Sequence, residues 1–392
     1  MKWSDLNKDV KKYLLFYGIA GFSFSSIIAA PTLGKLLKIP MEQLGWLFSV
    51  SYVFQALLSY IFGRRFEKIP VNYGLFSARL CFALGSLGFA LTTGLWNFAI
   101  AQVLLGFTDI FYPCQVMYER ALFPPKIREG IYSLEFFITE FVKSITYFAF
   151  VFILAPFMTG RGFLRSIFFA VFAANIFYAV SYLKILPRID SGTRIPKDHV
   201  IATTHLGTFL SIMFHQYFCY AAFNFASFLV ISYYLIDYFK LGGSSPFLFE
   251  MIFSVAVASS IFWKRSVKSH PSRNLTIGTG LIVCSFFLWV IPNVYLFFIS
   301  HVIMGIGFIF WFPAKETIKI QIAPRELGRW EGFFQGLNIF SRIFIPVLSA
   351  YVATRIGYHW VFVVSAILGL TALTVSIPAQ LWMRKNCPAI KT

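Results

Sequence analysis

A small number of ionisable side chains interrupt long stretches of apolar residues, and their types and spacing suit them to chemistry. The group comprises two carboxyl groups, two cations and one imidazole: Asp109, Glu140, Lys143, Arg342 and His215. An ionisable group in apolar surroundings costs several kcal/mol unless it is paired or hydrated. These residues are therefore candidates for solute binding or proton transfer.

Asp109 has no Lys or Arg within four residues on either side. A carboxyl group in such surroundings can retain a proton near neutral pH, which is what a proton-coupling group must do. We therefore predict that Asp109 carries a proton. Two alternatives stay open: a structural partnership with a base elsewhere in the chain, and a position facing lipid or headgroups.

Glu140 and Lys143 are three residues apart, so on a helix they share a face and can pair. Lys143 and Arg342 lie one residue off a 200-residue offset that recurs elsewhere in the chain. Two such cations facing one space would suit an anionic solute such as a carboxylate or a phosphate ester. Alternatively, Arg342 pairs with Asp109 or Glu140. His215 is either a proton or substrate ligand or a hydrogen-bonded interior histidine.

These residues must be positioned by helices that cross a membrane. The 392 residues are 58% hydrophobic and only 13% charged, against roughly 25% charged in a soluble domain. Runs of about 20 apolar residues are long enough to span a bilayer. Twelve such runs are predicted, at 13–33, 45–63, 73–93, 96–117, 131–157, 164–186, 204–235, 247–263, 275–292, 294–314, 330–353 and 358–383. The predicted fold class is an all-α integral membrane protein with 12 transmembrane helices.

The loops between these runs carry an uneven charge. If both termini and every second loop are cytoplasmic, these segments hold 25 of the 34 Lys and Arg residues. Basic residues concentrate on the cytoplasmic side of membrane proteins. We therefore predict a multi-pass protein of the plasma or inner membrane with both termini cytoplasmic. The net charge of +18 then faces anionic lipid, and no nucleic-acid partner is expected.

Short segments recur 200 residues apart. The segment 63–68, with two basic residues after its first position, aligns with 263–268, and Pro113 and Pro124 align with Pro313 and Pro324. This spacing predicts two pseudo-symmetric six-helix halves, an arrangement found in transporters. The predicted division is 1–186 for the first half, 187–203 for a cytoplasmic linker and 204–392 for the second half.

The loop after the second run carries a recognisable motif. It reads Gly63-Arg-Arg-Phe-Glu67-Lys68-Ile-Pro70 and resembles the G-x-x-x-D-R-x-G-R-R signature of the major facilitator superfamily, with Glu, Lys and Pro replacing Asp, Arg and a later Gly. The segments 105–106 with 123–128, and 357–362, are similar to the fourth helix with its following loop and to the opening of the twelfth helix in that family. The chain is thus identified as a member of the superfamily, with its subfamily open.

The resemblance implies a cytoplasmic gate formed by Gly63, Glu67, Lys68 and Arg128. Glu67 would accept hydrogen bonds from Arg128 or from the eleventh helix, and Gly63 would let the second helix approach a neighbour closely. The alternative for Glu67 is a solvated carboxylate among lysines.

The resemblance also implies function. We expect a secondary active transporter that moves a small solute by alternating access, coupled to protons, with an organic anion or metabolite as substrate. Export of amphipathic compounds or drugs is one alternative, and a non-transporting sensor or scaffold is another. The helix-5 region 147–156 lacks the glycine pattern of drug antiporters, and Gln102 stands where some proton-coupled members carry Arg.

Aromatic side chains of the first, fourth, seventh and tenth helices are expected to line the solute cavity: Phe24, Tyr112, Tyr217 and Trp311. The sequence lacks a nucleotide-binding G-x-x-x-x-G-K-[ST] motif and the H-E-x-x-H and G-x-S-x-G motifs of hydrolases. We therefore expect no enzymatic activity, cofactor or metal. The expected partners are the solute, protons and membrane lipids, and the expected state is a monomer.

Overall fold

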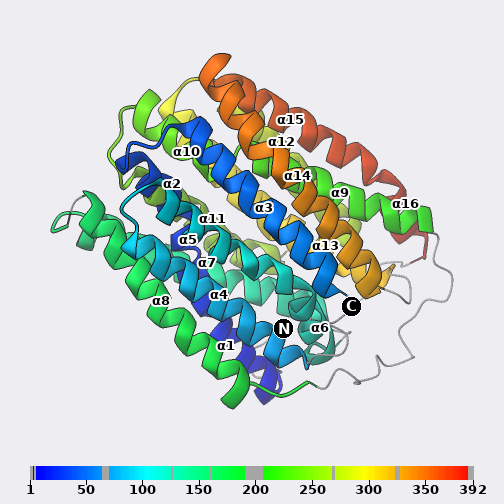
Figure 1. Cartoon of the computed structure of the whole chain (residues 1–392). Helices are drawn as coiled ribbons and strands as arrows, with labels where there is room; N and C mark the ends of the chain where they lie inside the picture. The colour runs from blue at the N-terminus through cyan, green and yellow to red at the C-terminus, as the bar shows by residue number, and fades with distance from the viewer. Residues whose placement is uncertain are drawn as a thin grey trace.

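The computed structural model describes residues 3, 6–63, 70–124, 127–158, 160–189, 206–266, 270–322 and 327–386. Within these ranges the secondary structure is helical, and long helices run roughly side by side through the molecule (Figure 1). This confirms the all-α prediction. A helical fold is expected for a chain in a bilayer, because the hydrocarbon core has no water for the backbone and a helix satisfies its backbone hydrogen bonds internally.

The first part of the chain folds into six helical segments, three of which are divided into shorter helices. In order, the helices are α1 (Lys8–Ser23), α2 (Ser25–Leu36), α3 (Met41–Gly63), α4 (Val71–Leu91), α5 (Leu95–Gly106), η2 (Phe107–Phe111), α6 (Tyr112–Leu122), α7 (Arg128–Phe148), η4 (Ala149–Leu154) and α8 (Gly160–Lys184). The divided segments are α1 with α2, α5 with η2 and α6, and α7 with η4.

The second part of the chain repeats this organisation. Its helices are α9 (Leu206–Phe225), α10 (Phe228–Tyr233), η6 (Tyr234–Tyr238), α11 (Ser245–Ser266), α12 (Pro271–Trp289), α13 (Val294–Gln321), α14 (Leu327–Arg355), α15 (Tyr358–Val375) and α16 (Ile377–Asn386). Most of the predicted linker, from residue 190 onward, lies outside the described residues, so the predicted division into halves stays a proposal.

Length and composition identify the membrane-crossing segments. Eight segments of the described chain are long and apolar enough to cross a membrane, and the pair formed by α5 and α6 meets the same criterion with a bend of 40°. The remaining helices α3, α11 and α12 run beside these segments (Figure 1). Together they agree with the twelve spans expected from the sequence, and the chain is a multi-pass membrane protein.

The two repeats differ locally at the matched prolines. Pro113 is the second residue of α6, where the fourth segment is interrupted by the 3-10 turn η2, whereas Pro313 lies inside the continuous helix α13. A proline removes one backbone donor and favours a break or kink. The sequence repeat therefore predicts where a break is allowed, but only the first copy is broken.

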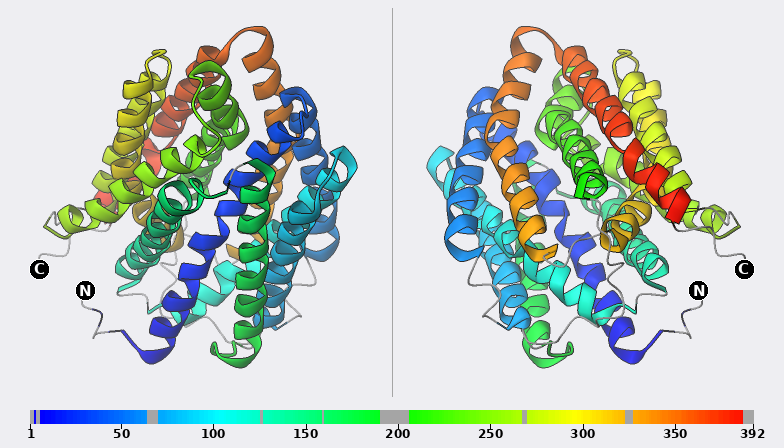
Figure 2. Two further views of the ribbon diagram at one scale, coloured as in Figure 1. Left: turned by 90° about the vertical axis from the view of Figure 1, so that its left-hand side faces the viewer. Right: turned by 90° about the vertical axis from the view of Figure 1, so that its right-hand side faces the viewer.

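We use first half for the segments α1 to α8 and second half for the segments α9 to α16, and helices of these two groups pack against each other in reciprocal pairs. The second segment (α3) packs on the eleventh (α14), and the fifth (α7) packs on the eighth (α11) and tenth (α13). The α3–α14 and α7–α11 contacts exchange with each other if the halves are swapped, as a parallel repeat requires. Figure 2 shows most of the blue-to-green ribbon on one side of the molecule and most of the yellow-to-red ribbon on the other, with the orange helix α14 beside the blue helix α3.

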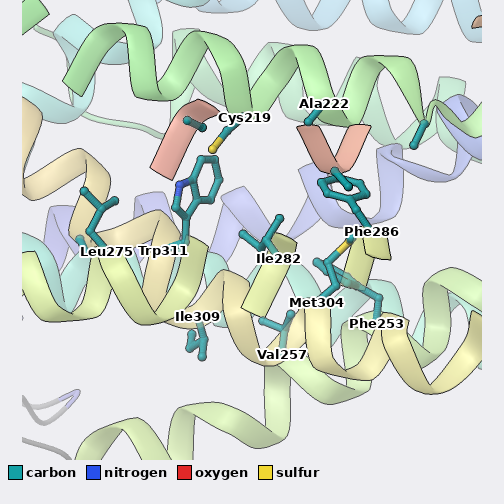
Figure 3. Packing of buried hydrophobic residues seen from close by; sticks show 14 of the residues in the cluster. Cys219, Ala222, Phe253, Val257, Leu275, Ile282, Phe286, Met304, Ile309 and Trp311 are labelled. Carbon is teal, nitrogen blue, oxygen red and sulfur yellow. The ribbon is translucent and has the colours of Figure 1, made fainter. Parts of the chain in front are cut away.

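Buried apolar side chains form three clusters. One lies within the second half, where Ile282, Phe286 and Trp311 fill the space between α9, α12 and α13 (Figure 3). Another lies within the first half around Tyr13 and Tyr118. The third draws residues from both halves, including Leu33 and Val230, so the halves share a core near the α2–α10 contact.

Candidate functional site

An ion pair between the two halves joins two of the predicted site residues. The Nη1 atom of Arg342, on α14, lies 2.9 Å from Oδ2 of Asp109, in η2. Both residues belong to apolar segments, yet their side chains are 30% and 42% exposed in the protein. The guanidinium also lies over the ring of Tyr52, on α3, at 5.2 Å from its centroid. The pairing of Asp109 with a distant base, left open by the sequence, is the arrangement found.

Local backbone chemistry places Asp109. Pro113 stands four residues later and has no N–H, so the usual helical donor to the Asp109 carbonyl is missing. The amide of Tyr112 donates to that carbonyl instead, and residues Phe107–Phe111 form a 3-10 turn. Short 3-10 stretches within helices often mark hinges. The acid therefore lies at a break in the fourth segment, directly before its 40° bend.

A second polar group is buried where α7 meets α11. Lys143 Nζ lies 2.7 Å from Oε1 of Glu140, and Ser254 Oγ, on α11, donates to Oε2 of the same carboxylate at 2.7 Å. The Lys143 ammonium also lies 3.9 Å from the ring centroid of Phe24, at the break between α1 and α2. The predicted intrahelical pair is therefore present, and its carboxylate bridges the two halves.

Glu250 and His301 form a further buried polar pair, on α11 and α13. The sequence analysis did not single out Glu250. The Nε2 atom of His301, on α13, lies 3.3 Å from Oε1 of Glu250, on α11, and both residues are buried. The imidazole stacks on Phe249 with ring centroids 3.6 Å apart. The signal available in the sequence was one acid within the apolar run 247–263, the same kind of signal that identified Glu140.

His215 is integrated into the core of the second half. It is fully buried, its Nδ1 lies 2.9 Å from the Ala372 carbonyl, and its Nε2 accepts from the Trp311 indole N–H at 2.9 Å. Because the Ala372 oxygen can only accept, Nδ1 carries the hydrogen and Nε2 is the acceptor. The geometry is that of a hydrogen-bonded interior histidine, the alternative stated for this residue, and its role in solute or proton binding stays a prediction.

The four predicted cavity aromatics belong to different helices, and their role in lining a solute cavity stays a prediction. Phe24 contacts Lys143 and packs edge-on against Phe228, with ring centroids 5.8 Å apart. Tyr112 begins α6, next to the break at Asp109, and both it and Tyr217, on α9, are half-buried. Trp311 is 1% exposed and belongs to the core of the second half. Of these aromatics, Phe24 contacts the candidate Lys143, and Trp311 contacts the candidate His215.

The predicted cytoplasmic gate is described only in part. Gly63 ends α3, and Glu67 and Lys68 lie outside the described residues. Arg128 begins α7, and its Nη2 donates to the carbonyls of Phe123 at 3.1 Å and Arg120 at 3.3 Å. Burial lowers the pKa of Arg128. The guanidinium therefore caps carbonyls at the end of α6, and the Glu67 latch stays a prediction.

Two groups of buried charges near the α6–α7–α13 region were also not singled out as sites. Glu119 and Glu135 lie on α6 and α7, and Glu316 on α13 forms ion pairs with Lys315 at 2.7 Å and with Lys319 at 2.6 Å. In the sequence, Glu119 and Glu316 come just after the predicted spans 96–117 and 294–314, and Glu135 lies near the start of the predicted span 131–157. Residues at such positions resemble ordinary solvated helix termini. In the part of the chain that the structure describes, no group of three His, Cys, Asp or Glu side chains could hold a metal ion.

The comparisons with known proteins cover both sequence and fold. Residues 213–386 match the family model for the Major Facilitator Superfamily. An uncharacterized MFS-type transporter of Bacillus subtilis (strain 168), YuxJ, is 25% identical over 124 residues, which is 31% of this chain and 32% of that protein. The match therefore spans about a third of the length of this curated relative.

Solved structures resemble the whole chain. The E. coli xylose transporter XylE, in a partially occluded inward-open conformation, has a TM-score of 0.67 at 14% identity, over 98% of this chain and 99% of that one. The human organic anion transporter MFSD10 has a TM-score of 0.69 at 11% identity, over 94% and 98%. At these identities the likeness shows the fold. Residues 213–386 thus resemble the major facilitator superfamily in sequence, and the whole chain shares the fold of solved transporters of that superfamily.

Proposed function

We propose that this protein is a secondary active transporter that moves a small solute by alternating access between its two halves. The observation that carries the proposal is the Asp109–Arg342 ion pair. It crosses between the halves, lies in apolar segments, and leaves both side chains partly exposed. A charge pair with a purely structural role in a membrane is expected to be buried among helices, whereas a solute site must be reachable.

Proton coupling follows from the charge balance of this pair. Arg342 stays protonated at any physiological pH and needs an anionic partner within the membrane. While Asp109 is ionised, it fills that role. When Asp109 takes up a proton, the guanidinium is released and is suited to a carboxylate or phosphate of the solute, which it can bind in a bidentate manner. One proton and one anionic group would then be carried together.

The Glu140–Lys143 pair is also balanced in charge, but both of its side chains are buried. Lys143 is neutralised by Glu140, so the two predicted cations do not face a solute as free charges in this conformation. Removing one partner of a buried pair leaves an uncompensated charge at a cost of about 3–5 kcal/mol. We therefore assign the first contact with the solute to Arg342 and treat Lys143 as an inner group.

The test uses purified protein in liposomes containing a pH-sensitive dye. A proton gradient is imposed, and lactate, citrate and glucose 6-phosphate are compared with xylose as a neutral probe. We expect proton movement with at least one anionic probe and none with xylose. Asp109→Asn should abolish the proton movement, and Arg342→Gln should abolish the response to the anion. Asp9→Asn, an exposed residue at the start of α1, is the matched control and should behave as wild type.

Ligand-induced thermal stabilisation, measured on the same variants, separates binding from flux. Asp109→Asn leaves Arg342 without its counter-ion, so stabilisation by the anion should persist and lose its pH dependence. Stabilisation by lipophilic cations but not by anions would favour export of amphipathic compounds instead. Stabilisation by a probe that is never transported would indicate a sensor. We further propose that the protein acts as a monomer in the plasma or inner membrane with both termini cytoplasmic.

A further inference from the structure

Two buried carboxyl groups lie next to each other in the first half, apart from the Asp109–Arg342 pair. Glu119 is 6% exposed and Glu135 is 3% exposed. They lie on consecutive helices, α6 and α7, and their carboxyl groups interact directly. Glu119 is ten residues after Asp109, roughly three helical turns further along the fourth segment.

Two neighbouring polar side chains donate hydrogen bonds to the carboxyl group of Glu119. The Tyr13 hydroxyl, on α1, donates to Oε1 of Glu119 at 2.6 Å, and Gln115 Nε2 donates to the same oxygen at 2.8 Å. The same Gln115 nitrogen donates to the Tyr17 hydroxyl at 2.9 Å. In contrast, Oε2 of Glu135 is buried without a hydrogen-bond partner. A buried carboxylate oxygen that accepts no hydrogen bond is costly, whereas a protonated carboxyl group is much less so.

The charged groups around the pair do not neutralise it. In the ion pairs between described residues, neither Glu119 nor Glu135 has a basic partner. The bases on the neighbouring α13, Lys315 and Lys319, both pair with Glu316. The titratable groups that interact with the pair come from α1, α7, α8 and α13 and are Tyr13, Tyr17, Tyr132, Tyr182 and Glu316. Beyond them, Arg79 on α4 interacts with Tyr17, and Lys319 interacts with Tyr132. Arg79 lies over the ring of Tyr178, at 4.4 Å from its centroid.

Two carboxyl groups that share a buried site without a base cannot both ionise at neutral pH. We propose that Glu119 and Glu135 hold one exchangeable proton between them and form a second proton-binding site in this protein. Loss of that proton changes the charge of the pair from −1 to −2, with the proton passing to water. Glu119 accepts two donated hydrogen bonds at one oxygen, so Glu135 is the member that carries the proton.

The position of the pair suggests how its proton couples to movement. Phe136, next to Glu135 on α7, stacks on Phe312 of α13 with ring centroids 5.1 Å apart, and Tyr132 meets the same ring edge-on. A displacement of α13 relative to α7 would change the distance between the acid pair and the Lys315–Glu316–Lys319 charges. This coupling role rests on the proposed alternating-access function, whereas the proton site itself does not.

Infrared difference spectroscopy of the full-length protein tests the proton site without transport. Raising the pH from about 5 to about 9 should remove a protonated-carboxyl C=O band that shifts in D₂O. Glu135→Gln should remove this titrating band and Glu119→Gln should shift the pH at which it titrates, whereas Glu42→Gln, at a partly exposed acid at the start of α3, should leave it unchanged. An unchanged band in both variants at the acid pair would overturn the proposal. A band that disappears at neutral pH when sodium replaces choline would assign the site to a metal cation instead.

Thermal unfolding gives an independent readout if the spectra of a variant are weak. An unfolded glutamate has released its proton above a pH of about 4.3, whereas the folded pair still holds one, so wild-type stability should fall as the pH rises from there until the folded pair also loses its proton. Glu135→Gln mimics the protonated group and should flatten this dependence, and a dependence as steep as that of wild type would count against the site. A titrating band in a protein that moves no protons with any solute would leave the site standing and contradict the proposed coupling.

Discussion

At the scale of single residues, three pairs of ionisable groups form within the membrane segments. Asp109 meets Arg342, Glu140 meets Lys143, and Glu250 meets His301. The cost of an isolated charge in apolar surroundings explains this pattern, since pairing or proton uptake is the only inexpensive state. The three pairs differ in exposure. Asp109 and Arg342 form the partly exposed pair, and it is the one that we propose binds the solute.

Breaking the buried Glu140–Lys143 pair should be more harmful than removing it. Glu140→Gln leaves the Lys143 ammonium buried without its carboxylate, and we expect a loss of about 3–5 kcal/mol in the free energy of unfolding. The double variant Glu140→Gln with Lys143→Met removes both charges and should recover most of that loss. Denaturant unfolding in detergent measures both. A double variant less stable than the single one would contradict the pair as drawn.

The imidazole of His215 should contribute to stability through its hydrogen bonds. His215→Leu leaves the Trp311 N–H and the Ala372 carbonyl without their partner, and we expect a loss of about 1–3 kcal/mol. His359→Leu, at an exposed position, is the control and should change the unfolding free energy by less than about 0.5 kcal/mol. Equal effects of the two substitutions would argue that His215 has no such structural role.

At the scale of elements, close helix contacts depend on glycines, as is usual for helices packed within membranes. The tightest contacts of the second half include α12 against α13. A Cβ atom added at Gly278 would lie 2.5 Å from the Trp311 backbone nitrogen and 2.7 Å from the Gly307 carbonyl oxygen. Since these are backbone atoms, neither can move without shifting a helix. The α12–α13 contact therefore positions Trp311 and, through it, His215.

Two glycines on α12 provide a matched test of this packing. Gly278→Ala should lower the unfolding free energy by about 1–3 kcal/mol, because the helices must separate to admit the methyl group. Gly280→Ala adds a methyl group where nothing lies within 4 Å, and alanine favours a helix by about 0.5–1 kcal/mol over glycine. The two substitutions should therefore have opposite signs in thermal unfolding. A similar change in both would show that α12 and α13 do not pack this closely.

At the scale of the whole molecule, side-chain contacts join the two halves at the end away from the start of α1 (Figure 1). Lys35, on α2, pairs with Asp237, in η6, and the Tyr233 hydroxyl donates to the Ile39 carbonyl at 2.8 Å. Nearby, the Thr354 hydroxyl donates to Glu42 at 2.8 Å. All of these contacts join the first half to the second. With the proposed orientation, this is the extracellular end, and these contacts hold it closed.

Reversing one charge of this closure should open it. Asp237→Lys sets two cations against each other, and the labelling rate of a cysteine at Leu229, buried on α10, should rise about fivefold, equivalent to about 1 kcal/mol. The swapped variant, with Lys35→Asp added, should return to the wild-type rate. A membrane-impermeant thiol reagent measures this after Cys81, Cys114, Cys219, Cys284 and Cys387 are replaced. Equal rates in the single and swapped variants would refute the closure.

The sequence alone predicted twelve helical spans and a resemblance to the major facilitator superfamily. These properties depend on hydropathy summed over about 20 residues and on local motifs, which need no knowledge of packing. It also identified Glu140 with Lys143, because residues three apart on a helix must share a face. For Asp109 it predicted a proton carrier and left a partnership with a distant base as an alternative, without indicating which base.

Only the tertiary structure decided the partners of the intramembrane charges. Asp109 and Arg342 are 233 residues apart and meet because η2 of one half faces α14 of the other. Glu119 and Glu135 resemble solvated helix ends in the sequence, yet the packing of α1, α6 and α7 buries both. A charge in a membrane must find a partner or a proton, and which of these it finds depends on which helices lie beside it in space.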